Sequence, residues 1–180
     1  MTWCFSEENF IVKIIVTTVF AVFLLSSSSF AGLKPNDTAP IFSLRDSAGN
    51  EFSLSDFIGA KSKENINGIV LSFFASWCIP CRNELPIVNS LSDELQGKGV
   101  KIVIVGVREG FASINALLVD LKVDKLTALS DQDGKVSELY QIRFLPVTFF
   151  IGGNGKVKHV IYGEIGSAQA LRDSADKLLH

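Results

Sequence analysis

The stretch that decides the fold is residues 68–84, GIVLSFFASWCIPCRNE. Residues 68–75 are mostly apolar, branched or aromatic, which predicts a buried β-strand. Beyond the stretch, apolar residues recur at helical spacing and predict a helix that ends near Gly97, because glycine tolerates the left-handed conformation that stops a helix. These apolar residues are Leu85, Val88, Leu91 and Leu95. Cys78 and Cys81 therefore lie where a strand leads into the N-terminus of a helix.

This position favours redox chemistry of the two cysteines. The unpaired N–H groups and the dipole of a helix N-terminus stabilise an anion, and so favour a thiolate at Cys78. Pro80 suits the first helical turn, because the N–H that proline lacks would have no partner there. Two intervening residues allow the sulfurs to form a disulfide, and we expect the sulfur of Cys78 to be exposed and that of Cys81 to lie deeper. The pattern predicts a reversible dithiol/disulfide pair.

Other uses of a CxxC pair fit less well. The remaining candidates for a zinc site, Cys4, His159 and His180, do not have ligand-like spacing. Covalent haem attachment needs a histidine directly after the second cysteine, where this chain has Arg82. An inert structural disulfide would close only a short loop and would stabilise the protein little. A Cu(I) site made of the two thiolates stays open, although no histidine accompanies the motif.

Three separated segments of the chain together resemble the TlpA/ResA-like thiol-disulfide oxidoreductases of the thioredoxin superfamily. They are APIFSL at 39–44, WCIPC at 77–81 and FLPVTFF at 144–150. The resemblance covers residues 35–180. It implies an α/β, thioredoxin-like fold with a central mixed β-sheet flanked by helices and an N-terminal β-hairpin extension. It also implies a protein-disulfide reductase with no metal and no cofactor beyond its own redox-active disulfide.

The same resemblance implies a client-binding site beside the cysteines. In the family, a proline at the position of Pro146 follows a cis peptide bond and lies against the cysteine pair. The backbone of Leu145 would then be free to pair with an extended client peptide. Trp77 and Pro80 are expected to border this site, although the bulk of Trp77 also fits a place at the edge of the core.

Resolution of a mixed disulfide requires a proton acceptor near Cys81. Cys78 is the expected nucleophile, and Cys81 must lose a proton before it can displace the client. Thioredoxins have a suitable aspartate on the preceding strand, but the matching residue here is Ser72. Glu84, one helical turn after Cys81, is the candidate acceptor, and ResA-like proteins carry an acidic residue at that spacing. The alternative is a solvated charge that favours the helix dipole.

The rest of the chain supplies the other elements of such a fold. Alternation of apolar residues predicts a hairpin at 42–54 with a turn at 46–50. Further along, periodicity predicts a strand at 101–107, a helix at 111–121, a strand at 126–129, a helix at 135–140, strands at 147–151 and 156–161, and a closing helix at 168–178. The polar segment 59–68 is expected to be a surface loop, and we assign it no function.

The N-terminus has the pattern of a targeting segment. No residue from 14 to 33 is charged, and residues 14–25 have the length of a signal-peptide apolar region. The small residues Ser29 and Ala31 suit cleavage after Ala31, while Glu7 and Glu8 are unusual before such a region. An uncleaved anchor at 14–33 therefore stays open. We expect a signal peptide or membrane anchor at 1–31 and a thioredoxin-like domain at 35–180, exported to the periplasm or the outer face of the cytoplasmic membrane.

Charge and composition limit the partners. The net charge of −2 and the lack of a basic block give no support for nucleic-acid binding. We expect a monomer that interacts with client proteins carrying disulfides or thiols, apocytochrome c among them, and with a thiol electron donor in the membrane.

Two alternative functions stay open. One is a copper- or client-binding module without turnover. The other is a peroxide-reducing relative, although residues 73–76 lack the threonine that supports a peroxidatic cysteine.

Overall fold

The computed structural model describes residues 32–60, 62–64 and 66–179. The predicted signal peptide or anchor at 1–31 lies outside the described residues. Within the described ranges, no helix is both long enough and apolar enough to cross a membrane.

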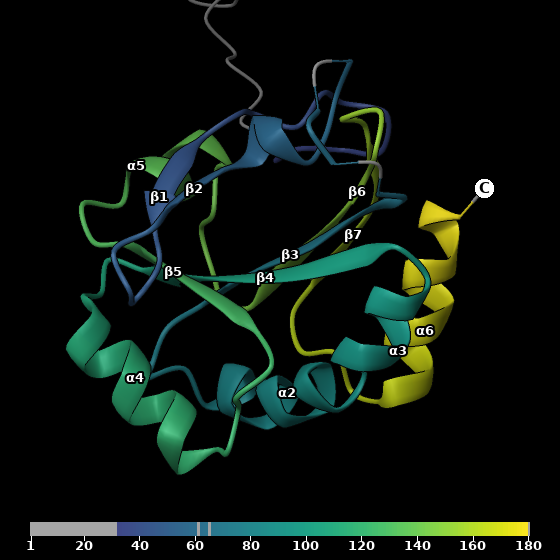
Figure 1. The fold of residues 1–180 in the computed structure, drawn as a ribbon. Coiled ribbons are helices and arrows are strands. Elements are labelled where there is room, and N and C mark those ends of the chain that lie inside the picture. Colours follow the sequence, from purple (N-terminus) through teal and green to yellow (C-terminus); the bar gives the residue numbers. More distant parts are fainter. Residues whose placement is uncertain (1–31, 61, 65, 180) are drawn as a thin grey trace, which may run out of the picture. The chain divides into compact units, whose positions relative to one another are not determined.

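A five-stranded mixed sheet forms the centre of the domain (Figure 1). Its order is β5 (Thr127–Asp131), β4 (Val100–Val107), β3 (Gly68–Phe74), β6 (Val147–Gly152) and β7 (Val157–Tyr162). The central strand β3 is buried along its whole length, pairs in parallel with β4 and pairs antiparallel with β6. The sequence prediction of a central mixed sheet is therefore confirmed.

Helices cover one face of this sheet, and the N-terminal hairpin with α5 covers the other (Figure 1). The first face carries α2 (Ile79–Ser90), α3 (Ser92–Gly97), α4 (Phe111–Asp120), α6 (Ala168–Ala175) and the short 3-10 helix η2 (Asp176–Leu178). The second face carries β1 (Ser43–Arg45), β2 (Glu51–Ser53), the 3-10 helix η1 (Leu54–Asp56) and α5 (Lys135–Leu139). The predicted hairpin extension is thus present.

The two faces of β3 enter different apolar clusters, because side chains alternate along a strand. Ile69, Leu71 and Phe73 pack toward the hairpin, together with a set of aromatic rings. Val70 and Phe74 pack toward the helices. Ser72 also points toward the helices, and it is a buried polar residue within this apolar layer. The strand therefore presents one hydroxyl to the underside of α2.

An aromatic group joins the hairpin to the sheet. Phe42 packs edge-on against Tyr140 with ring centroids 5.9 Å apart, and Tyr140 in turn packs against Phe73 at 5.2 Å. The Tyr140 hydroxyl donates a hydrogen bond of 2.8 Å to the carbonyl of Pro40. Such pairs contribute about 0.5–1.5 kcal/mol each beyond the area they bury, so the hairpin is an integral layer of the domain.

The helix after the cysteines differs from the prediction. It is interrupted at Leu91 and continues as α3, and Gly97 is still helical. The left-handed residue is Gly99, with φ of 71°. Asn67 explains the position of this turn, because its side-chain amide donates to the carbonyl of Lys98 (2.7 Å) and its N–H donates to the carbonyl of Gly99 (2.8 Å). The prediction of a stop at Gly97 was therefore wrong by two residues.

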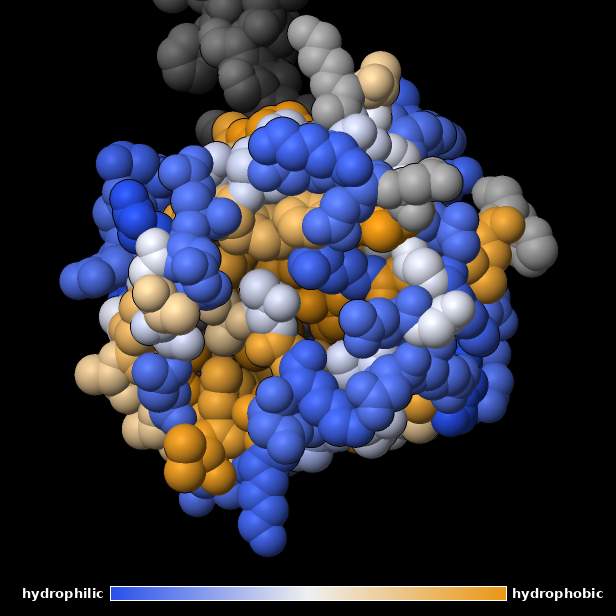
Figure 2. Space-filling view, in the orientation of Figure 1, coloured by the Kyte–Doolittle hydropathy of each residue, from blue (hydrophilic) through white to orange (hydrophobic). Residues whose placement is uncertain are grey.

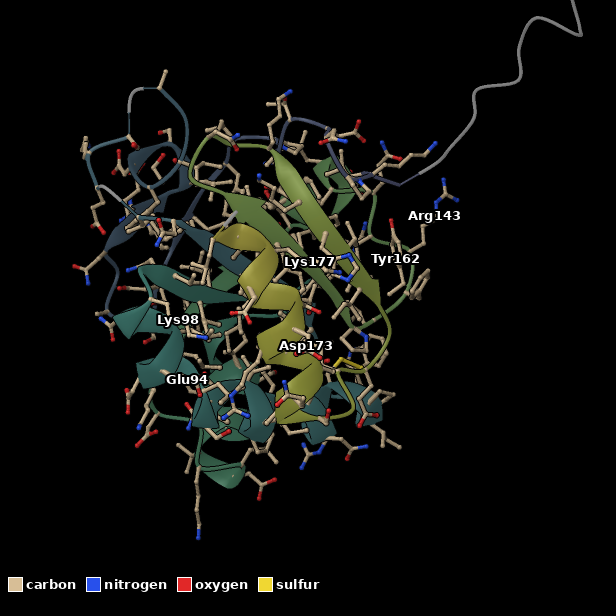
Figure 3. All side chains as sticks on the ribbon, turned by 90° about the vertical axis from the view of Figure 1, so that its right-hand side faces the viewer. Glu94, Lys98, Arg143, Tyr162, Asp173 and Lys177 are labelled. Atoms are coloured by element: carbon tan, nitrogen blue, oxygen red, sulfur yellow. A yellow bond between two sulfur atoms is a disulfide. The ribbon has the colours of Figure 1, made fainter. Side chains whose placement is uncertain are left out.

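Ion pairs connect α3, whose Glu94 and Lys98 are labelled in Figure 3, to the C-terminal helices. Glu94 pairs with Arg172 at 2.9 Å, and Lys98 pairs with Asp176 at 3.2 Å. These side chains are partly exposed, so each pair contributes only about 0–1 kcal/mol. On the opposite side of α2, apolar surface gathers over α4 (Figure 2), where Val119 is 78% exposed.

Candidate active site

The two cysteines form a disulfide at the junction of β3 and α2 (Figure 3). Cys78 is the N-cap residue of α2 and has extended backbone angles, while Cys81 lies in the first helical turn. The sulfur of Cys78 accepts a hydrogen bond of 3.3 Å from the N–H of Cys81. The predicted placement of the pair at a helix N-terminus is confirmed, and the N–H of Cys81, which would stabilise a Cys78 thiolate, points toward the sulfur.

The cysteines are less accessible than predicted. Cys78 is only 5% exposed and Cys81 is 0% exposed. The predicted order of depth is kept, but the expectation of an exposed Cys78 was wrong. The reason is an apolar cluster that contains both cysteines together with Phe74 and Leu85, and against which Leu145 packs. A client must therefore reach Cys78 across the rim of this cluster.

That rim is apolar and exposed. Trp77 is 73% exposed and Ile79 is 71% exposed, and they flank Cys78 in the sequence. The alternative of Trp77 as a residue at the edge of the core is wrong. Pro80 is exposed at the start of α2, as a proline in the first helical turn allows. Sequence reasoning missed Ile79. The available signal was that this apolar residue lies at the start of a helix, where exposed positions usually carry polar residues.

The loop before β6 supplies the other side of the site. The peptide bond between Leu145 and Pro146 is cis, as the family resemblance implied. Pro146 is buried, and the half-buried Leu145 packs against the cluster that contains both cysteines. Within the described ranges, the backbone of Leu145 has no hydrogen bond to another main-chain group. The exposed Phe144 precedes it and packs against Tyr162 of β7 with ring centroids 5.7 Å apart.

Glu84 is fully buried beneath the site. Its Oε1 accepts a hydrogen bond of 3.1 Å from the hydroxyl of Ser72, and its Oε2 accepts one of 2.9 Å from the N–H of Ile165. Burial raises the pKa of Glu84 to about 7, the two hydrogen bonds oppose this rise, and the negative charge of Glu164 adds to it. The alternative of a solvated helix charge is wrong. Cys81 and Glu84 are three residues apart on α2 and so share one side of the helix.

The burial of the Glu84 carboxyl group predicts that the stability of the protein depends on pH. Between the ordinary pKa of 4.5 and the folded value of about 7, the folded protein binds more protons than the unfolded chain. The free energy of unfolding should therefore fall as pH rises through this window, by about 3 kcal/mol from this group. Glu84→Gln removes the titration. In urea unfolding of the oxidised proteins at pH 4 and pH 8, the variant should lose less stability than the wild type, whereas equal losses would contradict the burial effect.

Glu109 is a site residue that sequence reasoning missed. Its carboxylate accepts hydrogen bonds from the N–H of Ser76 (2.8 Å) and from the Ser76 hydroxyl (2.5 Å), two residues before Cys78. The hydroxyl of Ser130 donates to the Glu109 carbonyl at 2.7 Å and holds it from the end of β5. The available signal was an acidic residue just after β4. The parallel strands β3 and β4 end at the same edge of the sheet, so a residue that follows β4 lies near the cysteines that follow β3. Glu109 fixes the approach of the chain to the cysteines.

Metal ligands do not gather in the described part of the chain. There, no group of three or more His, Cys, Asp or Glu residues is close enough to hold a metal ion. His159, to which sequence analysis gave no role, lies on β7 against Phe150 with ring centroids 5.7 Å apart.

Comparisons with known proteins agree with this site. Residues 35–160 match the AhpC/TSA family. The thiol-disulfide oxidoreductase ResA of Geobacillus thermodenitrificans is 34% identical over 146 residues, which are 81% of this chain and 78% of the relative. ResA of Bacillus subtilis is 31% identical over 144 residues, 78% and 76% of the two chains. A crystal structure from Chlorobium tepidum, designated thiol:disulfide interchange protein DsbE, has a TM-score of 0.71 at 29% identity and covers 82% and 99% of the two chains.

The fold and the CxxC disulfide define a thioredoxin-like thiol-disulfide oxidoreductase. This chain belongs to the AhpC/TSA family and, within it, to the ResA-like thiol-disulfide oxidoreductases. It is therefore an enzyme that exchanges disulfides with client proteins carrying thiols or disulfides, as the resemblance implied.

Proposed function

We propose that the protein works as a reductant of client disulfides on the outer side of the cytoplasmic membrane. The observation that carries this proposal is the Cys78/Cys81 pair at a helix N-terminus above a buried carboxyl group. In the reduced enzyme, the Cys78 thiolate attacks one sulfur of a client disulfide. A mixed disulfide forms, and the other client sulfur leaves as a thiolate. Cys81 then attacks the sulfur of Cys78, which releases the client dithiol and closes the enzyme disulfide.

Glu84 is the proposed proton acceptor for the second step. Cys81 attacks only as a thiolate, so its proton must move away. A carboxyl group whose pKa is raised to about 7 can take up a proton and return it near neutral pH, which an ordinary glutamate does poorly. Ser72 and Ile165 hold this carboxyl in place from two other elements.

Client binding is proposed to use main-chain and apolar contacts. The backbone of Leu145 would pair with an extended client segment, which gives affinity without reading side chains. The exposed Trp77, Ile79 and Phe144 would contact apolar client residues that flank the target cysteines. Pro80 and Pro146 would shape the two sides of this surface.

The finer assignments follow from the family resemblance and the N-terminal sequence. Clients are proposed to include the cysteines of apocytochrome c before haem attachment. Each turnover leaves an oxidised enzyme, so a thiol electron donor in the membrane must return two electrons. Residues 1–31 would direct export or anchor the protein, the domain would act as a monomer, and no cofactor beyond the disulfide would take part.

Three assays on the purified, reduced protein test this function against its alternatives. We expect stoichiometric reduction of insulin disulfides, with one Cys78–Cys81 disulfide formed per disulfide reduced. Oxidation of the dithiol by hydrogen peroxide faster than by insulin would favour a peroxide-reducing enzyme. Tight Cu(I) binding together with inactivity toward insulin would favour a copper-binding module. Each of the last two results would contradict the proposal.

A further inference from the structure

The buried layer beneath the active site holds a hydroxyl group that the mechanism above does not use. Thr148 lies on β6, two residues after Pro146, and is 0% exposed. Its Oγ1 has no hydrogen-bond partner within the described residues. An unpaired hydroxyl in an apolar interior destabilises the folded state, so a residue of this kind calls for a physical explanation.

The sheet register places Thr148 directly beside Ser72. Ser72 of β3 pairs with Thr148 of β6 and, on its other side, with Ile104 of β4. Thr148 pairs with Ile161 of β7. Across the sheet, the row therefore reads Ile104, Ser72, Thr148, Ile161, and paired residues point to the same face. Two hydroxyl-bearing residues are therefore neighbours between two isoleucines, on the face of the sheet where Ser72 contacts Glu84 of α2.

The hydrogen-bond capacity of Ser72 fits this neighbour. Its single hydrogen is donated to Glu84 Oε1 at 3.1 Å, so the lone pairs of its oxygen can accept a hydrogen bond from a neighbouring donor. Thr148 carries one hydroxyl hydrogen and lies on the adjacent strand, where directly opposed Cβ atoms are about 4.5–5.5 Å apart. Rotation of the threonine side chain or one bridging water can join the two oxygens.

We propose that Thr148 is a positioning residue for Glu84, as the outer member of a two-hydroxyl chain in which Thr148 donates to Ser72 and Ser72 donates to the Glu84 carboxylate. A hydroxyl that itself receives a hydrogen bond is a stronger donor, so Thr148 stabilises the ionised carboxylate through Ser72. When Glu84 takes up a proton, both hydroxyls can reverse direction without movement of the backbone. The inference deepens the proposed function, since it rests on Glu84 as the proton acceptor.

Apart from the proposed two-hydroxyl chain, few charged groups influence the ionisation of Glu84. Glu164, in the loop after β7, is the group that acts on it by charge. Cys78 and Cys81 lie on the same helix, and Arg172 of α6 is paired with Glu94. From β3, the hydroxyl of Ser72 contacts Glu84, and the buried neighbours of Ser72 along the strand on this face, Val70 and Phe74, are apolar.

A double-mutant cycle on the full chain tests the inference. The readout is the pKa of Glu84 in the oxidised protein, followed through its carboxyl carbon by NMR. We expect Thr148→Val to lower the acid dissociation constant of Glu84 about threefold, and Thr148→Ser to leave it unchanged. In a Ser72→Ala background, Thr148→Val should have no further effect, because the link between Thr148 and Glu84 is already absent.

The double-mutant cycle distinguishes an effect carried by the two-hydroxyl chain from an effect of local packing. If Thr148→Val shifts the titration equally with and without Ser72, the effect is one of local polarity and the inference is wrong. No shift in either background also overturns it. Because the titration is measured without a client, it is independent of turnover. A titration that behaves as expected, alongside an exchange rate that does not respond to Glu84, would reject the proposed role of Glu84 and leave the hydroxyl chain intact.

Discussion

A Cys81→Ser protein is expected to become trapped on its client as a mixed disulfide with Cys78. Cys78 is the cysteine nearer the surface and is the N-cap residue of α2, while Cys81 is fully buried. Loss of the resolving thiol leaves the first attack possible and blocks the second. Steady-state insulin reduction should fall about 10³-fold or more, because the two cysteines act as one unit. Non-reducing gels and mass spectrometry would detect the adduct.

Two matched variants make this trap interpretable. Cys78→Ser should abolish both turnover and the adduct, because the buried Cys81 cannot replace Cys78. Cys4→Ser, combined with each variant, removes the third cysteine of the chain and excludes adducts formed through it. If Cys78→Ser formed the adduct and Cys81→Ser did not, the assigned order of the two cysteines would be reversed.

The Glu84→Gln protein is expected to exchange disulfides about 10²-fold more slowly at pH 7 and to lose the part of its pH–rate profile that titrates near pH 7. Glutamine fits the site, since its carbonyl can accept from the N–H of Ile165 and its amide can donate to the oxygen of Ser72. The geometry is therefore kept and the proton acceptor is lost. Stopped-flow measurement of client reduction between pH 5 and pH 9 provides the profile.

Glu164→Gln is the matched control for this variant. Glu164 is exposed, lies next to Ile165 and acts on Glu84 only through its charge. Its neutralisation should shift the profile slightly toward lower pH and change the maximal rate by less than about threefold. A Glu84→Gln protein with an unchanged profile would reject the assignment of Glu84 as proton acceptor.

Features set by neighbouring residues were predictable from the sequence. The strand, the cysteine pair and the helix start of residues 68–84 depend on local pattern, and so do the hairpin and the succession of strands and helices along the chain. Features that depend on distant segments were not. The contact between Glu109 and Ser76 joins residues 33 positions apart. Burial of Glu84 requires a loop 81 positions away, and the helix break after Ser90 precedes a turn that Asn67 holds from the other end of β3.

Burial of the cysteines shows the same limit. The spacing of Cys78 and Cys81 predicted their order of depth, but not that both would be buried in an apolar cluster against which the distant Leu145 packs. Thr148 could not have been singled out either, since a threonine in a strand is ordinary. The proposed role of Thr148 depends on the strand register, which places it beside Ser72. In each case the missing information is which distant backbone a side chain meets.

The most direct test of the account is an equilibrium redox titration of the Trp3→Phe protein, which leaves Trp77 as the only tryptophan, next to Cys78. Fluorescence is followed in glutathione or dithiothreitol buffers, with alkylation and mass spectrometry counting the thiols. The account predicts one reversible transition between a dithiol and the Cys78–Cys81 disulfide, with a tenfold change in ratio for each ~30 mV, as for a two-electron couple. The absence of any transition would contradict the account. A transition that persists in a Cys78→Ala variant would contradict it as well.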